Sequence, residues 1–381
     1  MVNRILIGLL CAVLLAGCGT QNGKPDKKNE SVSKTDEDKY IATEKISATP
    51  ESVKVDERNQ ILQIGVDKRK LVLRDLTTGE IVHTYKLKKN QTSYIYTKIS
   101  HGYCAEIITA NRELKDQTNG GIIIYDTPGN DEIENSSIVF FDEDLKEKNR
   151  IDIGSIAKKI DHQEILTSEC AVSRDGSKVV WDLGDRILCY DVKKEQDSYY
   201  EQINKDDIVM DYFDFVGNDK IAFFGSQGEM EHDTCYGYLD LSDGKVYSFV
   251  ENEYEAFSLW TNEKYMWIND GADPKTGKSS GKFVVVDTEH CKKIITKVDG
   301  TESTRSRLTE DGKYVVSVME TSEKDFRVRQ YDAGTGEIKE EKEYKFKEGV
   351  HTSEIIYIGS GVYGIVYGMS EGVRLEEFSL K

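Results

Sequence analysis

The sequence has little proline, little histidine and no long apolar segment. Only 4 prolines and 6 histidines occur among its 381 residues. The apolar run from Ile5 to Leu15 is too short to cross a bilayer as a permanent helix. Neither a G-x-S-x-G nor an H-E-x-x-H motif is present. The chain therefore carries no recognised catalytic motif.

Basic residues are also in deficit. The chain has 51 Lys and Arg residues against 69 Asp and Glu residues, which gives a formal net charge of -18. Such a surface repels nucleic acid and anionic lipid headgroups. We therefore expect no nucleic-acid partner.

Cysteine is present but forms no pattern. Cys11 and Cys18 lie near the N-terminus, and the rest of the 7 are scattered: Cys104, Cys170, Cys189, Cys235 and Cys291. No C-x-x-C pair occurs among them, and the odd number left after the leader argues against a full disulfide framework. Cys189 stands inside an apolar run and is predicted to be a core residue.

Residues 1–17 have the composition of an export leader. Arg4 precedes the apolar run, which ends in Leu15-Ala16-Gly17-Cys18. These four residues resemble the lipobox of bacterial lipoprotein precursors, in which the cysteine thiol is acylated and the leader is cut just before it. The resemblance implies lipid attachment at Cys18 and a place on the extracytoplasmic face of the cell membrane. The alternative is an ordinary secretory leader that happens to contain cysteine.

Residues 18–47 connect this leader to the rest of the chain. The stretch 18–38 has no aromatic residue and is predicted to be a disordered tether, because it cannot bury enough apolar surface to offset its chain entropy. The stretch 39–47 alternates like a strand. We expect it to pair with the last repeat described below, although it is alternatively just the end of the tether.

From about residue 52 onward, one unit recurs along the chain. Its marker is an apolar strand that ends in an acid, as in the stretch from Ile187 to Asp191. The marker residues are Asp75, Asp142, Asp191, Asp240, Asp287, Asp332 and, in the last copy, Ser379. The steps between them are 67, 49, 49, 47, 45 and 47 residues. Such steps are typical of four-stranded propeller blades, which take roughly 40–50 residues.

Tight polar turns divide each unit further. One precedes the marker, as in 173–176, and another follows it, as in 242–244. Their Asp, Asn and Gly residues supply the positive φ that short hairpins need, so each unit is interpreted as four antiparallel strands, a to d.

These units together predict an all-β, seven-bladed β-propeller over residues 39–381, with its ring closed by the strand at 39–47. A β-sandwich or a pair of β domains is the alternative. The blades are expected at about 52–89, 92–154, 168–200, 209–250, 254–298, 303–346 and 353–381.

Strands alternate in direction within a blade, so the a–b and c–d turns share one face of the disc, and the b–c and d–a loops share the other. The long b–c loops are 110–137, 225–233 and 269–281. The first is predicted to be an extended hairpin, and the later connection at 155–165 is expected to contain one helical turn. Long loops on a rigid scaffold are the usual place for binding. The alternative is that they are insertions without a role.

One of these loops gathers possible metal ligands. Glu229, Glu231, His232 and Asp233 follow one another closely, and carboxylate and imidazole groups bind several divalent metals. Their spacing matches no recognised metal motif, so a hydrated acidic loop is favoured over a metal site. No catalytic residue and no cofactor is assigned.

Some turns resemble those of known propeller families. The segments 75–80 and 332–337 resemble the D-x-x-T-G-x turn of quinoprotein-type repeats. The segments 173–176 and 311–314 resemble the S-x-D-G-x-x turn of WD40 and TolB-like propellers. The tryptophan that follows the first turn in quinoprotein repeats is absent, and so are the G-H and W-D dipeptides of WD40 repeats. The resemblance implies a propeller lipoprotein and carries no activity with it.

These features favour a lipid-anchored, extracytoplasmic module that binds a protein or glycan partner through its b–c loop face. An alternative is a cell-surface glycan hydrolase or lyase with acidic residues at the channel mouth, since the spacing of carboxylates in space is not visible in a sequence. A purely structural envelope component is a third possibility.

Overall fold

The computed structural model describes a β-rich chain. It covers residues 60–64, 70–75, 80–115, 117–119, 122–124, 126–228, 233–251, 257–270, 282–297, 304–309, 311–322, 325–345, 351–359, 362–369 and 372–379. The helical segments within these ranges are η4 (Asn130–Glu132), α2 (Ile153–Ile160), η5 (Gln163–Leu166) and α3 (Gln202–Lys205). None of the helices in these ranges has the length and apolar character needed to cross a membrane.

Most strands belong to four-stranded antiparallel sheets whose strands follow one another in chain order. Sheet β4-β5-β8-β9 contains Gln91–Ile99, Gly102–Ala110, Ile133–Phe141 and Glu147–Asp152. Sheet β10-β13 contains Cys170–Val172, Lys178–Asp182, Ile187–Asp191 and Gln196–Tyr200. Sheet β14-β17 contains Ile208–Val216, Lys220–Gln227, Asp233–Asp240 and Val246–Glu251.

Two further four-stranded sheets follow. Sheet β18-β21 contains Phe257–Thr261, Tyr265–Asp270, Lys282–Asp287 and Lys292–Lys297. Sheet β22-β25 contains Thr304–Leu308, Tyr314–Ser322, Asp325–Asp332 and Ile338–Lys345.

The remaining strands form smaller sheets within the described residues. Three strands at each end of the series form β1-β3 (Gln60–Ile64, Lys70–Asp75, Ile81–Lys86) and β26-β28 (His351–Gly359, Val362–Met369, Gly372–Ser379). A separate two-stranded hairpin pairs β6 (Gln117–Asn119) with β7 (Ile122–Ile124).

The recurring acid has a structural role that explains its position. In each of the five four-stranded sheets it ends, or directly follows, the third strand. Its carboxylate accepts a hydrogen bond from the backbone N–H two residues later, at 2.9–3.1 Å, in the turns after Asp142, Asp191, Asp240, Asp287 and Asp332. This side chain therefore caps the turn into the fourth strand, as Asp does in Asx-turns.

Both faces of the middle strands are buried, which explains why they read as continuous apolar runs. In β11, Val179 and Trp181 pack toward the preceding sheet, whereas Val180 packs toward the following one. Each of the described apolar clusters combines residues of two successive sheets. The core is thus a series of layers between sheets rather than one central body of side chains.

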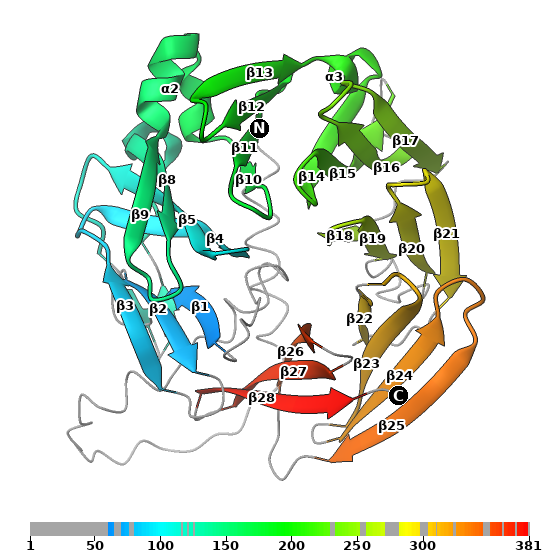
Figure 1. Ribbon diagram of the computed structural model, residues 1–381. Helices are drawn as coiled ribbons and strands as arrows, with labels where there is room; N and C mark the ends of the chain where they lie inside the picture. The colour runs from blue at the N-terminus through cyan, green and yellow to red at the C-terminus, as the bar shows by residue number, and fades with distance from the viewer. Residues whose placement is uncertain are drawn as a thin grey trace, which may run out of the picture.

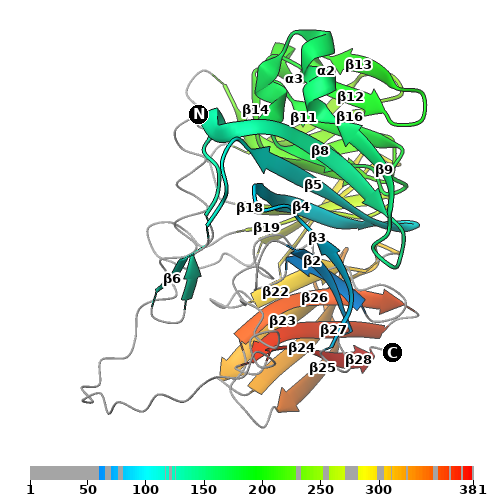
Figure 2. The ribbon, with the colours of Figure 1, turned by 90° about the vertical axis from the view of Figure 1, so that its left-hand side faces the viewer.

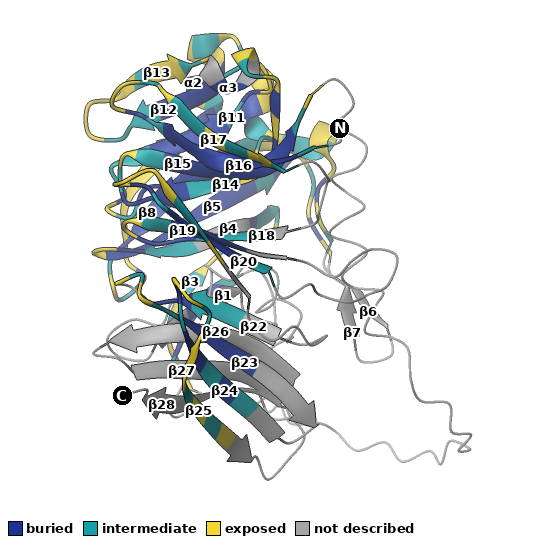
Figure 3. Cartoon of the chain, turned by 90° about the vertical axis from the view of Figure 1, so that its right-hand side faces the viewer, coloured by how far each residue is buried: buried dark blue, intermediate teal, exposed yellow. Residues whose placement is uncertain are grey.

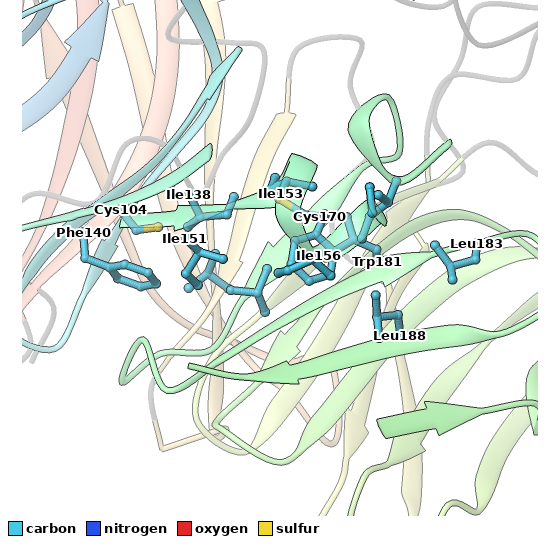
Figure 4. Close-up of a cluster of buried hydrophobic side chains, with 14 of the residues drawn as sticks. Cys104, Ile138, Phe140, Ile151, Ile153, Ile156, Cys170, Trp181, Leu183 and Leu188 are labelled. Carbon is cyan, nitrogen blue, oxygen red and sulfur yellow. The ribbon is translucent and has the colours of Figure 1, made fainter. Parts of the chain in front are cut away.

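Figure 4 shows one such layer. Cys104 and Phe140 approach it from one sheet, and Trp181 and Leu188 from the next. Ile153 and Ile156 of α2 close its end, so the helix covers the seam between two sheets. Its first turn is fixed by Asp152, whose side chain accepts a hydrogen bond from the Ser155 backbone N–H.

The sheets follow one another around a central axis (Figure 1). The first strands of neighbouring sheets contact each other, as β10 does β14 and β14 does β18, and these strands lie nearest the axis. The fourth strands, such as β13 and β17, lie at the periphery. Buried residues accordingly concentrate in the middle strands, and exposed residues at the turns and outer edges (Figure 3).

The predicted all-β architecture of four-stranded antiparallel sheets is confirmed. The predicted strand at 39–47 and the start of the first blade at 52–59 lie outside the described residues. Closure of the ring and the count of seven blades therefore stay predictions. Cys189 is 6% exposed, as expected of a core residue.

Boundaries differ from the sequence prediction in several places. The loop expected at 225–233 loses 225–227 to β15 and residue 233 to β16. The insertion expected at 110–137 spans only 111–132, because β8 begins at Ile133 and pairs with β5 through Asn135 and Ser136. The polar composition of that stretch had suggested a loop. The helical turn expected within 155–165 is the longer helix α2, which begins earlier, at Ile153.

The turns after the third strand predict a stabilising substitution. The residue four places after the acid has positive φ in four sheets; it is glycine in two of them (Gly244, Gly336) and Glu195 or Cys291 in the others. A residue with a Cβ pays about 1–2 kcal/mol for this conformation. We expect Glu195→Gly to raise the free energy of unfolding by about 0.5–1 kcal/mol after the entropic cost of glycine is subtracted. The change in the free energy of unfolding can be measured by urea titration, with tryptophan fluorescence as the signal.

Two control variants isolate the backbone effect. Glu195→Ala removes the same side chain but keeps the Cβ, so its unfolding midpoint should stay near that of the parent chain. Gly336→Ala should lower stability by about 1 kcal/mol, because it introduces the Cβ at the equivalent position. Equal midpoints for Glu195→Gly and Glu195→Ala would contradict the explanation.

Candidate functional site

The turns between first and second strands share one face of the molecule. The Ser100 backbone N–H donates to the Arg174 carbonyl at 2.8 Å, and the Arg174 N–H donates to the Gly217 carbonyl at 3.4 Å. The Gly217 N–H donates in turn to the Asn262 carbonyl at 3.0 Å. Successive sheets are therefore tied together through these turns. The connections between second and third strands, and those between sheets, emerge at the opposite ends of the strands and form what we call the loop face.

The turns opposite the loop face are tight and internally hydrogen-bonded. In one of them, Ser173 Oγ donates to Asp175 at 2.8 Å and accepts from the Lys178 N–H at 2.9 Å. Thr309 Oγ1 makes the same pair of bonds, with Asp311 at 2.7 Å and the Tyr314 N–H at 3.0 Å. Such turns leave little room for variation, so the loop face is where the described chain departs most from the repeat.

The largest departure is the insertion at 111–132, whose base is held by Arg112. Its guanidinium pairs with both oxygens of Asp126, at 2.7 and 2.9 Å, and with both oxygens of Glu132, at 2.6 and 2.8 Å. Hydrogen bonds from Arg112 hold the pKa of Glu132 below its usual range. Two bidentate pairs on one planar group fix the two sides of the insertion relative to each other.

Backbone contacts anchor this base to the sheet beside it. The Leu114 N–H donates to the Lys89 carbonyl at 3.1 Å, and the Asn111 N–H donates to the Glu132 carbonyl at 2.8 Å. Leu114 itself is 5% exposed. The hairpin β6-β7 extends from this base and stands clear of the sheets (Figure 2). The insertion is thus a hairpin on a rigid support, as the sequence predicted.

A buried carboxyl lies below the loop face, between the second and third sheets of the series. Glu106 of β5 is 4% exposed, and its carboxyl accepts a hydrogen bond from Ser136 Oγ of β8 at 2.6 Å. Burial raises the pKa of Glu106 to about 7; the hydrogen bond from Ser136 opposes this shift, and the charge of Glu169 adds to it. Glu106 is therefore neutral in slightly acidic solution, and it is charged only at a cost in desolvation.

The predicted metal ligands are mostly outside the described residues. Glu229, Glu231 and His232 lie outside the described residues. So do two other features predicted from the sequence, the loop at 271–281 and Cys18. Asp233 is the first residue of β16, is partly exposed, and pairs with Gln227 of β15 in the sheet. In the part of the chain that the structure covers, no three His, Cys, Asp or Glu side chains group as metal ligands.

The structure brings out residues that sequence reasoning missed. Val209 and Tyr212 of β14 are 44% and 46% exposed, although β14 is an innermost strand. The sequence does hold one sign of this polar surrounding: the segment between Lys205 and Lys220 contains aspartates and no Lys or Arg. Glu106 gave no signal, because its neighbours in the sequence do not reveal that both sides of its strand are covered.

No protein-family model matches the chain, and no curated protein sequence matches it. Among solved structures, it is similar to a chain of Kuenenia stuttgartiensis hydrazine synthase, with a TM-score of 0.50 and 10% identity over 88% of this chain and 97% of that chain. That chain is a β-propeller. The protein therefore has a β-propeller-like fold. A chain of the mitotic checkpoint complex matches with a TM-score of 0.49 and 7% identity over 96% of this chain and 100% of that chain.

The buried carboxyl predicts a pH-dependent stability. The pKa of Glu106 is about 7 in the folded chain against 4.5 for the free group, so folding retains a proton that the unfolded chain loses. The stability that this retained proton contributes is fully present below pH 4.5 and is lost as pH rises through about 7. We expect Glu106→Gln, which is neutral throughout, to be more stable than the parent at pH 8 by about 2–3 kcal/mol.

The comparison should be made by urea titration at two pH values. At pH 5 the advantage of Glu106→Gln should shrink to below about 1 kcal/mol, because the parent carboxyl is then protonated in the folded state. Glu134→Gln, which makes the same change at an exposed position of the neighbouring strand β8, is the matched control. An advantage of Glu106→Gln that is equal at both pH values would contradict the assignment.

Proposed function

We propose that the chain is a lipid-anchored, extracytoplasmic module that binds a protein partner at the cell envelope through its loop face. The observation that carries the proposal is the rigid base of the insertion, in which Arg112 pairs with Asp126 and Glu132. A hairpin held in one orientation loses less conformational entropy on binding than a free loop. Elements presented in this way on a rigid scaffold are common binding sites.

The charge and the fold also support a binding role. A β-propeller-like scaffold offers a broad face made of connections, and the net charge of -18 favours partners with basic surfaces. The flexible stretch predicted at 18–38 would hold this face away from the lipid attached at Cys18. Two acyl chains on one residue suffice for stable anchoring.

Glu106 does not support the alternative of a glycan hydrolase. Its raised pKa is the property that a general acid needs. However, the residue is 4% exposed, and its neighbours Cys104 along β5 and Ile138 across to β8 belong to the apolar layer below α2. A glycan cannot reach a carboxyl in that position, so we interpret Glu106 as a structural group.

The lipid anchor can be tested with one substitution. We expect the parent chain to fractionate with membranes and to incorporate an alkyne-labelled fatty acid in growing cells. Cys18→Ser should lose the label and leave the membrane fraction, because the acylated thiol is gone. Cys11→Ser, within the leader, is the control and should retain both properties. Labelling of Cys18→Ser at the parent level would sink the anchor proposal.

The binding role can be tested by cross-linking in intact cells that express the full chain. We expect one dominant protein partner to be captured by the parent chain. Replacing residues 117–124 with a short Gly-Ser turn should reduce the yield at least about tenfold, and Arg112→Ala should reduce it too, because the base of the hairpin loses its pairing. Glu195→Gly alters a turn on the opposite face and should capture the partner normally.

Two outcomes would argue against this role. Equal capture by the parent and the 117–124 variant would remove the hairpin from the interface. The absence of any partner with the parent chain would overturn the binding proposal as a whole.

A further inference from the structure

A carboxyl stands in the apolar layer between the sheets β4-β5-β8-β9 and β10-β13, which we call the seam (Figure 4). Along β5, Tyr103, Ala105 and Ile107 pack toward the first sheet of the series. Glu106 alternates with them and lies on the same side of the strand as Cys104, which belongs to the seam. The one charged residue of β5 is therefore buried inside the seam, where it is 4% exposed.

Glu106 has little to compensate a negative charge. In the described residues its carboxyl accepts one hydrogen bond, from Ser136 Oγ at 2.6 Å, and it pairs with no Lys, Arg or His. The titratable groups that face it are Glu169 and Cys170 at the next sheet and Cys104 on its own strand, and none of these is basic. Ionisation of Glu106 thus places an uncompensated charge in an apolar layer.

The other elements around the seam bring apolar groups to it. Helix α2 buries Ile153, Ile156 and Ala157 there, and its lysines at 158 and 159 are exposed. The short helix η5 buries Ile165, and its acid at 164 is exposed. The charge of Glu106 is felt across this layer, since burial and then that charge raise the pKa of the Cys170 thiol. The seam is therefore closed at least cost when Glu106 is neutral.

The hydrogen bond in the seam joins the two strands that carry the insertion. β5 ends at Ala110, directly before the insertion, and β8 begins at Ile133, directly after it. The side chain of Asn135 in β8 also accepts a hydrogen bond from the Gly154 N–H of α2 at 2.9 Å. The base of the insertion, the start of β8 and the helix that covers the seam are thus connected, and local opening of the seam affects all three.

We infer that the seam is a proton-controlled latch for the insertion. With Glu106 protonated, the two sheets stay closed and the insertion is held in one position. When Glu106 ionises, the seam opens locally so that water reaches the carboxylate, and the strands below the insertion lose their support. The partner accordingly binds the closed state and is released when the seam opens. This last statement rests on the proposed function, whereas the opening of the seam does not.

The pH range of the latch follows from burial of the carboxyl. The pKa of Glu106 is about 7 in the folded chain and 4.5 for the free group, mainly because of burial. The closed seam therefore retains a proton that the open seam loses. Closure is most favourable below pH 4.5 and weakens as the pH rises through about 7.

The chain carries its own reporters of this opening. Cys104 and Cys170 lie in the seam, whereas Cys189 and Cys235 lie in the next layer, between the third and fourth sheets, and all four are buried. The full chain in mild detergent is labelled briefly with a maleimide at pH 6 and pH 8, and mass spectrometry identifies the labelled cysteines. We expect labelling of the seam thiols, relative to the thiols of the next layer, to rise at least about tenfold at pH 8.

Matched variants attribute this rise to the carboxyl. Glu106→Gln cannot ionise, so its ratio of labelling should be the same at both pH values. Ser136→Ala removes the donor to the carboxylate, so its ratio at pH 8 should exceed that of the parent. Glu134→Gln, at an exposed position of β8, should give the ratios of the parent. A ratio in the parent that does not change with pH, or an equal rise in Glu106→Gln, would overturn the latch.

Cross-linking in cells held at pH 6 and pH 8 tests whether the latch controls binding. We expect the parent to capture its partner at least about fivefold less at pH 8, and Glu106→Gln to capture it equally at both pH values. Equal capture by the parent at both pH values would refute control of the partner by the seam. If no partner is captured at either pH, the proposed function fails, and the thiol labelling still decides whether the seam opens.

Discussion

The fold depends on burial of both faces of the middle strands in the four-stranded sheets whose side chains the structure describes. An isolated four-stranded sheet of this composition would expose two apolar faces, and one neighbour covers only one of them. Each apolar layer in the described residues accordingly joins two successive sheets, as the layer between Cys104 and Trp181 does. Stacking sheets face to face around an axis satisfies every face without a separate core. The hydrogen bonds between successive turns then hold neighbouring sheets in register at one face.

In this arrangement the two faces of the molecule differ in how much the length and sequence of their connections can vary. The turns at one face are fixed by capping carboxylates such as that of Asp191 and by contacts to the next sheet. Among the described residues the loop face shows no such repeated constraint, and there the chain carries the insertion supported by Arg112 and the helix α2. The rigid face keeps the sheets together, and the other face accommodates chemistry that differs from sheet to sheet.

Two polar features within this frame have different significance. Glu106 lies in an apolar layer, where burial raises its pKa, so the effect of its charge appears in the free energy of unfolding. Asp211 and Asp214 of β14 are only partly buried, so their charge also acts on groups in the solvent. The number of nearby acids does not distinguish the two cases. Access to solvent does, and it depends on which sheet covers which strand.

The strand order, the place of the capping acids and the presence of a hairpin in the second unit could be predicted from the sequence alone. These depend on residues close together in the chain: an apolar run, an acid and the turn that follows it. Prediction from the sequence failed for features that depend on contacts between residues far apart in the chain. Ser136 looked like part of a loop because its partner Glu106 is far away in sequence. The bulge beside Gly225 and the exposure of Tyr212 arise only when β14 meets β15 and the neighbouring sheets. Tertiary structure decided these features because burial is a property of the assembled layers, and no local pattern of residues records it.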